Sequence, residues 1–121
     1  MTSEPVRLLT RLRRATLFSL SGLRAALRNE PAFRLELALS VFVIPAAWIL
    51  RSSGVERALL IGSWMMVILV EIINSAIEAV VDRIGQERHE LSGRAKDLGS
   101  AAVFCSLVMT ATIWLIVLSH E

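Results

Sequence analysis

Three long apolar segments constrain what this sequence can fold into more than any other feature. Phe33 to Leu50 is interrupted only by Arg34 and Glu36 near its start and by one serine. Ala58 to Val70 has no charged residue, and Leu98 to Leu118 has none over 21 residues. A helix needs about 20 mostly apolar residues to cross a hydrocarbon core roughly 30 Å thick. The chain of 121 residues, 55% of them hydrophobic, therefore has room for three spanning helices and is too apolar for a soluble domain.

The residues before the first apolar segment have a different pattern, that of an amphipathic helix. Leucines follow one line at helical spacing while arginines lie opposite, as expected for a helix in the membrane interface. Packing of this helix on the bundle is an alternative that does not exclude the first. We predict one all-α integral membrane domain over residues 1–121, with the interfacial helix at 6–28 and spans at 32–50, 57–83 and 98–118. Asn29 is expected to cap the first span, and Pro45 to kink it.

The distribution of basic residues predicts the orientation of the spans. Six arginines precede the first span, two basic residues fall in the connection 51–57, four fall in the connection 82–97, and none follows the last span. Basic residues concentrate on cytoplasmic flanks. The N-terminus and the second connection should therefore be cytoplasmic, and the C-terminus should lie outside. Trp48, Trp64 and Trp114 all fall toward the predicted outer ends of their spans, where indole rings favour the interface.

Polar residues inside the second span are the strongest indication of function. Glu71, Asn74, Glu78 and Asp82 lie within a narrow arc of one helix face. A charged residue at the bilayer centre costs about 2.5–3.5 kcal/mol on insertion scales, so retaining two glutamates suggests a cation, a proton relay or catalysis. Glu30 and Glu36 add carboxylates at the same level. Pairing of these acids with arginines between helices is the structural alternative.

The residue types suit a site for a metal ion and an anion. Mg²⁺ takes one or two carboxylates together with substrate phosphates, and a partly desolvated carboxylate without metal can act as a general base. Arg94 and Lys96, in the second connection, are suited to phosphate oxygens. A solvated interfacial loop would explain them too, and His89 alone is more typical of a surface residue. The sequence has no Walker A or protein-kinase motif, so any nucleotide site is of another kind.

Four segments together resemble the prokaryotic diacylglycerol kinase family over nearly the whole chain. The motif from Glu71 to Arg83, followed by His89 to Ala102, is similar to the family's central signature, and Gly22–Ala26 and Asn29–Arg34 match its N-terminal region. The resemblance implies a homotrimer with active sites shared between subunits, in the bacterial inner membrane. It also implies transfer of the γ-phosphoryl group of ATP, with Mg²⁺, to diacylglycerol, giving phosphatidic acid, and no nucleic-acid partner.

The resemblance assigns roles by matching position. Glu71 would be the general base, assisted by Asn74, and Glu30 and Glu78 would hold Mg²⁺. The expected nucleotide contacts are Arg11, Phe18, Glu30, Glu78, Glu87, Arg88, His89, Lys96 and Asp97. The expected lipid contacts are Arg11, Arg24, Glu36, Glu71 and Ser100. Phe18 stands where relatives can have a tyrosine, and Gln86, Arg88 and Pro31 also depart from the family pattern.

Two other functions fit part of the pattern. Undecaprenol kinase is a related activity on a polyprenyl alcohol, although the central motif resembles the diacylglycerol-specific branch more. A membrane protein without enzymatic activity could use the Glu71–Glu78 face as a proton or cation pathway.

Overall fold

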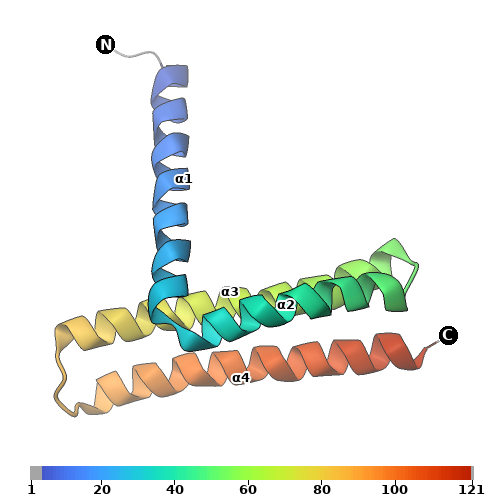
Figure 1. The fold of residues 1–121 in the computed structure, drawn as a ribbon. Helices are drawn as coiled ribbons and strands as arrows, with labels where there is room; N and C mark the ends of the chain where they lie inside the picture. The colour runs from blue at the N-terminus through green and yellow to red at the C-terminus, as the bar shows by residue number, and fades with distance from the viewer. Residues whose placement is uncertain (1–3, 121) are drawn as a thin grey trace.

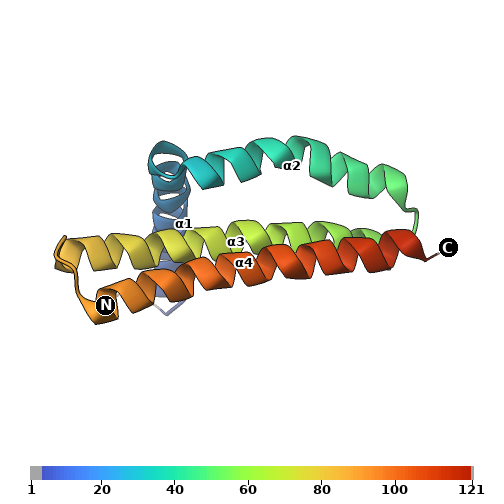
Figure 2. The ribbon, with the colours of Figure 1, turned by 90° about the horizontal axis from the view of Figure 1, so that it is seen from below.

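The computed structural model describes residues 4–120, which form four helices: α1 (Glu4–Asn29), α2 (Pro31–Leu50), α3 (Gly54–Ile84) and α4 (Glu90–Ser119). Helices α2, α3 and α4 run alongside one another, with α3 packed against both others, and α1 projects sideways from this bundle (Figures 1 and 2). All three bundle helices are long and apolar enough to cross a membrane. The prediction of an all-α chain with three such helices is therefore confirmed. The sideways projection of α1 is the direction that a helix in the membrane plane would take.

Helix α4 begins well before its apolar segment. Only residues 85–89 separate it from α3, so most of the connection predicted over residues 82–97 is helical, and Lys96 and Asp97 belong to α4. His89 caps the helix, because its Nδ1 accepts a hydrogen bond from the Leu91 amide at 3.1 Å. The predicted start of this helix at residue 98 followed from hydropathy, and hydropathy marks only the part of a helix that lipid can cover.

The corner between α1 and α2 consists of the single residue Glu30. The expected cap by Asn29 is wrong, because its side-chain amide donates back to the Ala25 carbonyl at 3.0 Å, and Glu30 takes the N-cap position. Arg34 donates from Nη1 to the carbonyls of Leu27 and Arg28, each at 3.0 Å. A cation thus satisfies the exposed carbonyl end of α1. This contact ties the two helices together at the corner and so fixes where Glu30 stands.

Side-chain hydrogen bonds link the bundle helices in their apolar region. Trp64 Nε1 donates to Ser40 Oγ at 2.8 Å, and Thr110 Oγ1 donates to the Ser63 carbonyl at 2.9 Å. Trp64 is only 9% exposed, so its expected position as an interfacial anchor is wrong, whereas Trp48 is exposed at the end of α2. Inside a membrane such polar groups need partners from the protein itself.

Two arginines hold the opposite end of the bundle together. Arg51 donates to the carbonyls of Val117, Leu118 and His120 at 3.0, 2.8 and 3.0 Å. Arg57 donates from Nε to the Arg51 carbonyl at 2.7 Å, and its guanidinium stacks on the Trp48 ring, 3.9 Å from the centroid. Arg51, in the short α2–α3 connection, and Arg57, in the first turns of α3, therefore both have structural roles.

Candidate active site

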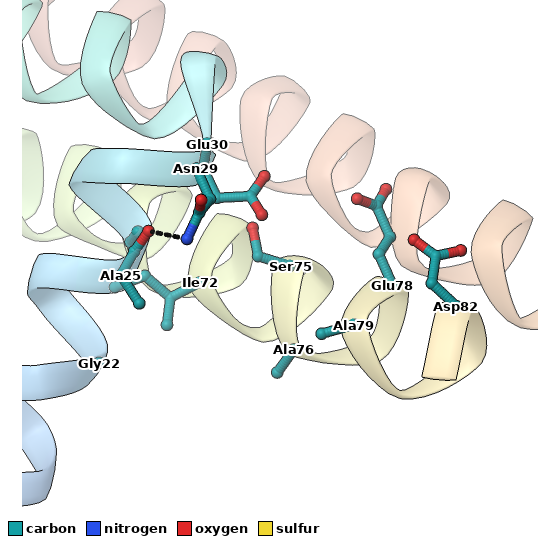
Figure 3. Close-up of a pocket in the computed structure, with 11 residues that line it drawn as sticks. Gly22, Ala25, Asn29, Glu30, Ile72, Ser75, Ala76, Glu78, Ala79 and Asp82 are labelled. Carbon is teal, nitrogen blue, oxygen red and sulfur yellow. Dashed lines mark hydrogen bonds between the residues drawn. The ribbon is translucent and has the colours of Figure 1, made fainter. Parts of the chain in front are cut away.

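A groove of about 510 Å³ lies between the α1–α2 corner and the C-terminal half of α3. Much of its lining consists of glycine and alanine residues, whose small side chains leave space between the helices. Figure 3 shows Glu30 extending from the corner toward the face of α3 that bears Ser75 and Glu78. The residues that line the groove are Gly22, Ala25, Ala26, Asn29, Glu30, Ile72, Ser75, Ala76, Glu78, Ala79 and Asp82. The groove thus brings together Glu30 and Glu78, which are 48 positions apart in the sequence.

The polar face of α3 becomes more buried from its C-terminal end inward. Asp82 is exposed, Glu78 is half-buried, and Asn74 and Glu71 are 8% and 7% exposed. Asn74 Nδ2 donates to Glu78 Oε1 at 3.4 Å, a long hydrogen bond. The predicted polar face of α3 therefore extends from the mouth of the groove to the buried carboxylate of Glu71.

The acidic residues of this region repel one another. Glu71 is within electrostatic range of Glu30 and Glu78, and Glu36 is within range of Glu71. Glu36 Oε2 is buried and accepts no hydrogen bond. Ion pairs within residues 4–120 include Arg51–Glu56, Arg94–Glu90 and Lys96–Asp82. None of these three pairs joins an arginine to Glu30, Glu36, Glu71 or Glu78, and Lys96 lies within electrostatic range of Glu78.

Such a cluster of carboxylates suits a hard cation. No three acidic, histidine or cysteine side chains converge as a complete metal site within the described residues. Mg²⁺, however, commonly uses one or two carboxylates and takes its other oxygens from phosphates and water. Glu30 and Glu78, which share the groove, fit that donor set.

A second cavity, of about 180 Å³, lies at the α3–α4 connection beside the groove. Its polar lining gathers Asp82, residues 86–89, Ser92 and Lys96. Lys96 Nζ lies 2.7 Å from Asp82 Oδ1, so this cation is already paired across α3 and α4. Four of the predicted nucleotide contacts (Glu87, Arg88, His89 and Lys96) therefore meet around one cavity.

Other predicted site residues lie apart from these two cavities in the single chain. Arg11 and Phe18 are exposed on α1 and line neither the groove nor the α3–α4 cavity. Figure 1 shows α1 extending away from the α3–α4 connection. Arg24, Asp97 and Ser100 are exposed, on α1, α4 and α4 respectively, and Glu36 is half-buried on α2. One chain therefore does not bring the whole predicted set together.

Sequence reasoning missed the small residues that create the groove. Gly22 and Ala25 on α1 and Ala76 and Ala79 on α3 all line it. Their helical spacing within each segment was the available signal, since small residues at i and i+3 allow helices to approach or leave room for a ligand. Ser75 also lines the groove, which could not be predicted from the polar face of Glu71, Asn74, Glu78 and Asp82.

A short helical chain with three membrane-length helices and an acidic groove at one end of the bundle defines a small integral membrane protein. Comparison with known proteins makes this specific. The family model for prokaryotic diacylglycerol kinase matches residues 17–118. The chain belongs to the prokaryotic diacylglycerol kinase family, as its motifs predicted.

The similarity to individual members extends over most of each chain. The diacylglycerol kinase of Escherichia coli K12 is 55% identical over 113 residues, which cover 92% of both chains. That of Haemophilus influenzae is 50% identical over 106 residues, covering 88% of this chain and 90% of the relative. The diacylglycerol kinase of Pseudomonas aeruginosa is 48% identical over 110 residues, covering 91% and 89%.

Proposed function

We propose that this protein phosphorylates diacylglycerol to phosphatidic acid with MgATP, at the cytoplasmic face of a bacterial inner membrane. The observation that carries the proposal is the shared groove of Glu30 and Glu78, with Glu71 buried further along the same face of α3. Family membership supports the choice of reaction and lipid. The concentration of basic residues before α2 and around the α3–α4 connection supports a cytoplasmic position for the N-terminus and this connection, and a position outside for the C-terminus.

In the proposed reaction, Glu71 accepts the proton of the lipid hydroxyl. The hydroxyl oxygen forms a bond to the γ-phosphorus, the bond from that phosphorus to the bridging oxygen breaks, and ADP leaves with the electron pair. Phosphoryl transfer depends mainly on positioning and charge neutralisation. Glu30 and Glu78 would hold Mg²⁺, which neutralises phosphate charge when bound. Asn74 keeps the Glu78 carboxylate in place through its 3.4 Å hydrogen bond.

The polar cavity at the α3–α4 connection would receive the nucleotide. Lys96 can contact phosphate oxygens with the ammonium hydrogens that its pair with Asp82 leaves available. Glu87, Arg88 and His89 line the same cavity, and Asp97 follows Lys96 on α4. Arg24, Glu36 and Ser100 are assigned to the lipid, with Glu71.

We also propose that the working form is a homotrimer. Arg11 and Phe18 are assigned to the substrates but lie on α1, away from the α3–α4 cavity (Figure 1). A second copy could supply them. Large apolar side chains on α2 and α4 are exposed in the single chain, among them Phe42, Phe104 and Leu115, and both lipid and neighbouring subunits would cover them.

The proposal is tested with purified protein in detergent micelles, with radiolabelled γ-phosphate ATP, Mg²⁺ and either diacylglycerol or undecaprenol. We expect labelled phosphatidic acid and at most slow transfer to undecaprenol. Transfer to undecaprenol alone would favour the related polyprenol kinase. Absence of transfer to both lipids, with cation or proton flux in vesicles, would establish the pathway alternative.

A further inference from the structure

Gly99 of α4 lies directly against the side chain of Asn74 on α3. A methyl group built at Gly99 would collide with Asn74 Oδ1 and lie 3.2 Å from its Cγ. Gly22, Gly54, Gly62 and Gly93, in contrast, have nothing within 4 Å of the corresponding position. Gly99 is also buried. The absence of a side chain at this one glycine therefore makes room for a particular amide.

The orientation of that amide follows from the charge of its other neighbour. Nδ2 faces Glu78 Oε1 at 3.4 Å. The opposite flip would set Oδ1 against the carboxylate, with two acceptors facing each other. With Glu78 Oε1 as the acceptor, Nδ2 lies on the Glu78 side and Oδ1 is turned toward α4. Asn74 Oδ1 is buried and has no hydrogen-bond partner, and it occupies the position where a side chain at residue 99 would begin.

We propose that Gly99 is a positioning residue, which acts through Asn74 to hold the Glu78 carboxylate at the mouth of the groove. The inference rests on the proposed function, in which Glu78 and Glu30 hold the Mg²⁺ of MgATP. An added methyl group at residue 99 meets the end of a flexible side chain and no backbone atom. The collision is therefore relieved with least disturbance of the fold if the Asn74 side chain rotates. This rotation moves Nδ2 away from Glu78.

The structure also predicts a background in which the added methyl group has no further effect. Without the amide of Asn74, the nearest remaining atom is Asn74 Cβ at 3.9 Å, an ordinary van der Waals distance. The Asn74→Ala variant should therefore accept Gly99→Ala without further effect. Two groups that act as one unit give non-additive changes in a double-mutant cycle.

The test measures binding of the magnesium complex of a non-hydrolysable ATP analogue by calorimetry. The proteins are the wild type, Gly99→Ala, Asn74→Ala and the double variant, and Gly62→Ala is the control for the glycine change itself. Loss of a hydrogen bond to a charged group predicts about tenfold weaker binding for each single variant. The double variant should bind like Asn74→Ala, and Gly62→Ala like the wild type. Equal, additive losses in both backgrounds, or wild-type affinity of Gly99→Ala, would overturn the proposal.

A second measurement does not depend on ligand binding. The chain has two asparagines, Asn29 and Asn74, so protein labelled with ¹⁵N-asparagine gives two side-chain amide signals. Gly99→Ala should shift the Asn74 signal and leave that of Asn29 unchanged; an unchanged Asn74 signal would overturn the contact. If the wild type bound no analogue, the proposed function would fail while this signal still tested the contact. If Gly99→Ala did not fold, the double variant should fold, and its failure to do so would overturn the role of Asn74.

Discussion

Lys96 and Asp82 form an ion pair between α4 and α3, with Nζ 2.7 Å from Oδ1. Both side chains are about half exposed, at 45% and 47%, so the pair itself should contribute less than about 1 kcal/mol to stability. Its position in the lining of the α3–α4 cavity suggests that Lys96 is held ready for an anionic ligand.

Substitutions at the two ends of this ion pair distinguish a structural role of Lys96 from a role in phosphate binding. Lys96→Met should weaken binding of the magnesium–ATP analogue complex by about tenfold or more, because a charge-assisted contact is lost. Asp82→Asn breaks the same ion pair but keeps the cation, and should bind much better than Lys96→Met. Calorimetry on both variants provides the comparison. Equal losses in the two would assign the effect to the ion pair and not to phosphate binding.

Glu71→Gln tests the proposed general base. It keeps the size and burial of the side chain but removes the proton acceptor, so kcat should fall by about 10²–10⁴-fold. Analogue binding and assembly should remain close to those of the wild type. Glu90→Gln, at an exposed position, controls for loss of a carboxylate. A correctly assembled Glu71→Gln enzyme that keeps more than about a tenth of kcat at saturating substrates would exclude this role.

Glu78→Gln tests the proposed metal ligand. An amide oxygen carries no charge to offset Mg²⁺, and the neighbouring Asn74 would then face an amide in place of a carboxylate. We expect at least about tenfold weaker binding of the magnesium–analogue complex, and a smaller change for binding of the analogue without metal. Calorimetry in the presence and absence of Mg²⁺ measures the difference. Wild-type affinity for the metal complex would remove Glu78 from this role.

Arg51→Ala should destabilise the bundle with little effect on the chemistry. The change leaves three carbonyls at the end of α4 without their donor, and we expect a loss of about 2 kcal/mol. Glu56→Gln, which removes only the ion pair at 3.2 Å, should cost less than about 1 kcal/mol. Thermal unfolding in detergent measures both. A smaller loss of stability for Arg51→Ala than for Glu56→Gln would contradict this role of the Arg51 hydrogen bonds.

The proposed orientation is tested with reporters and labels in intact cells. A reporter fused after the last residue, Glu121, which lies outside the described residues, should be active only outside the cytoplasm. A cysteine at position 86, in the α3–α4 connection, should react with a thiol reagent only after the cytoplasmic side is opened. Labelling of that position from outside would reverse the topology.

Much of the fold could be predicted because hydropathy is a local property. A run of about 20 apolar residues has few stable structures in lipid besides a helix, so the number of spanning helices followed from the sequence. The ends of the helices were harder to predict. Helix α4 begins at Glu90 and not near Leu98, because a cap at His89 and not the edge of the apolar run ends the loop. Trp64 was misplaced because a tryptophan near a helix end can bind a serine of a neighbouring helix as well as the interface.

The sequence by itself determined that Glu71, Asn74, Glu78 and Asp82 share one face of α3, because helical periodicity fixes the angle between residues on the same helix. Only the tertiary structure decided how deeply each of them lies and which residues from other helices meet them. Glu30 joins Glu78 because Arg34 secures the α1–α2 corner beside α3. Asn74 can turn its amide toward Glu78 because α4 presents a glycine at that point. These contacts depend on which surfaces of separate helices pack together, and one-dimensional periodicity does not carry that information.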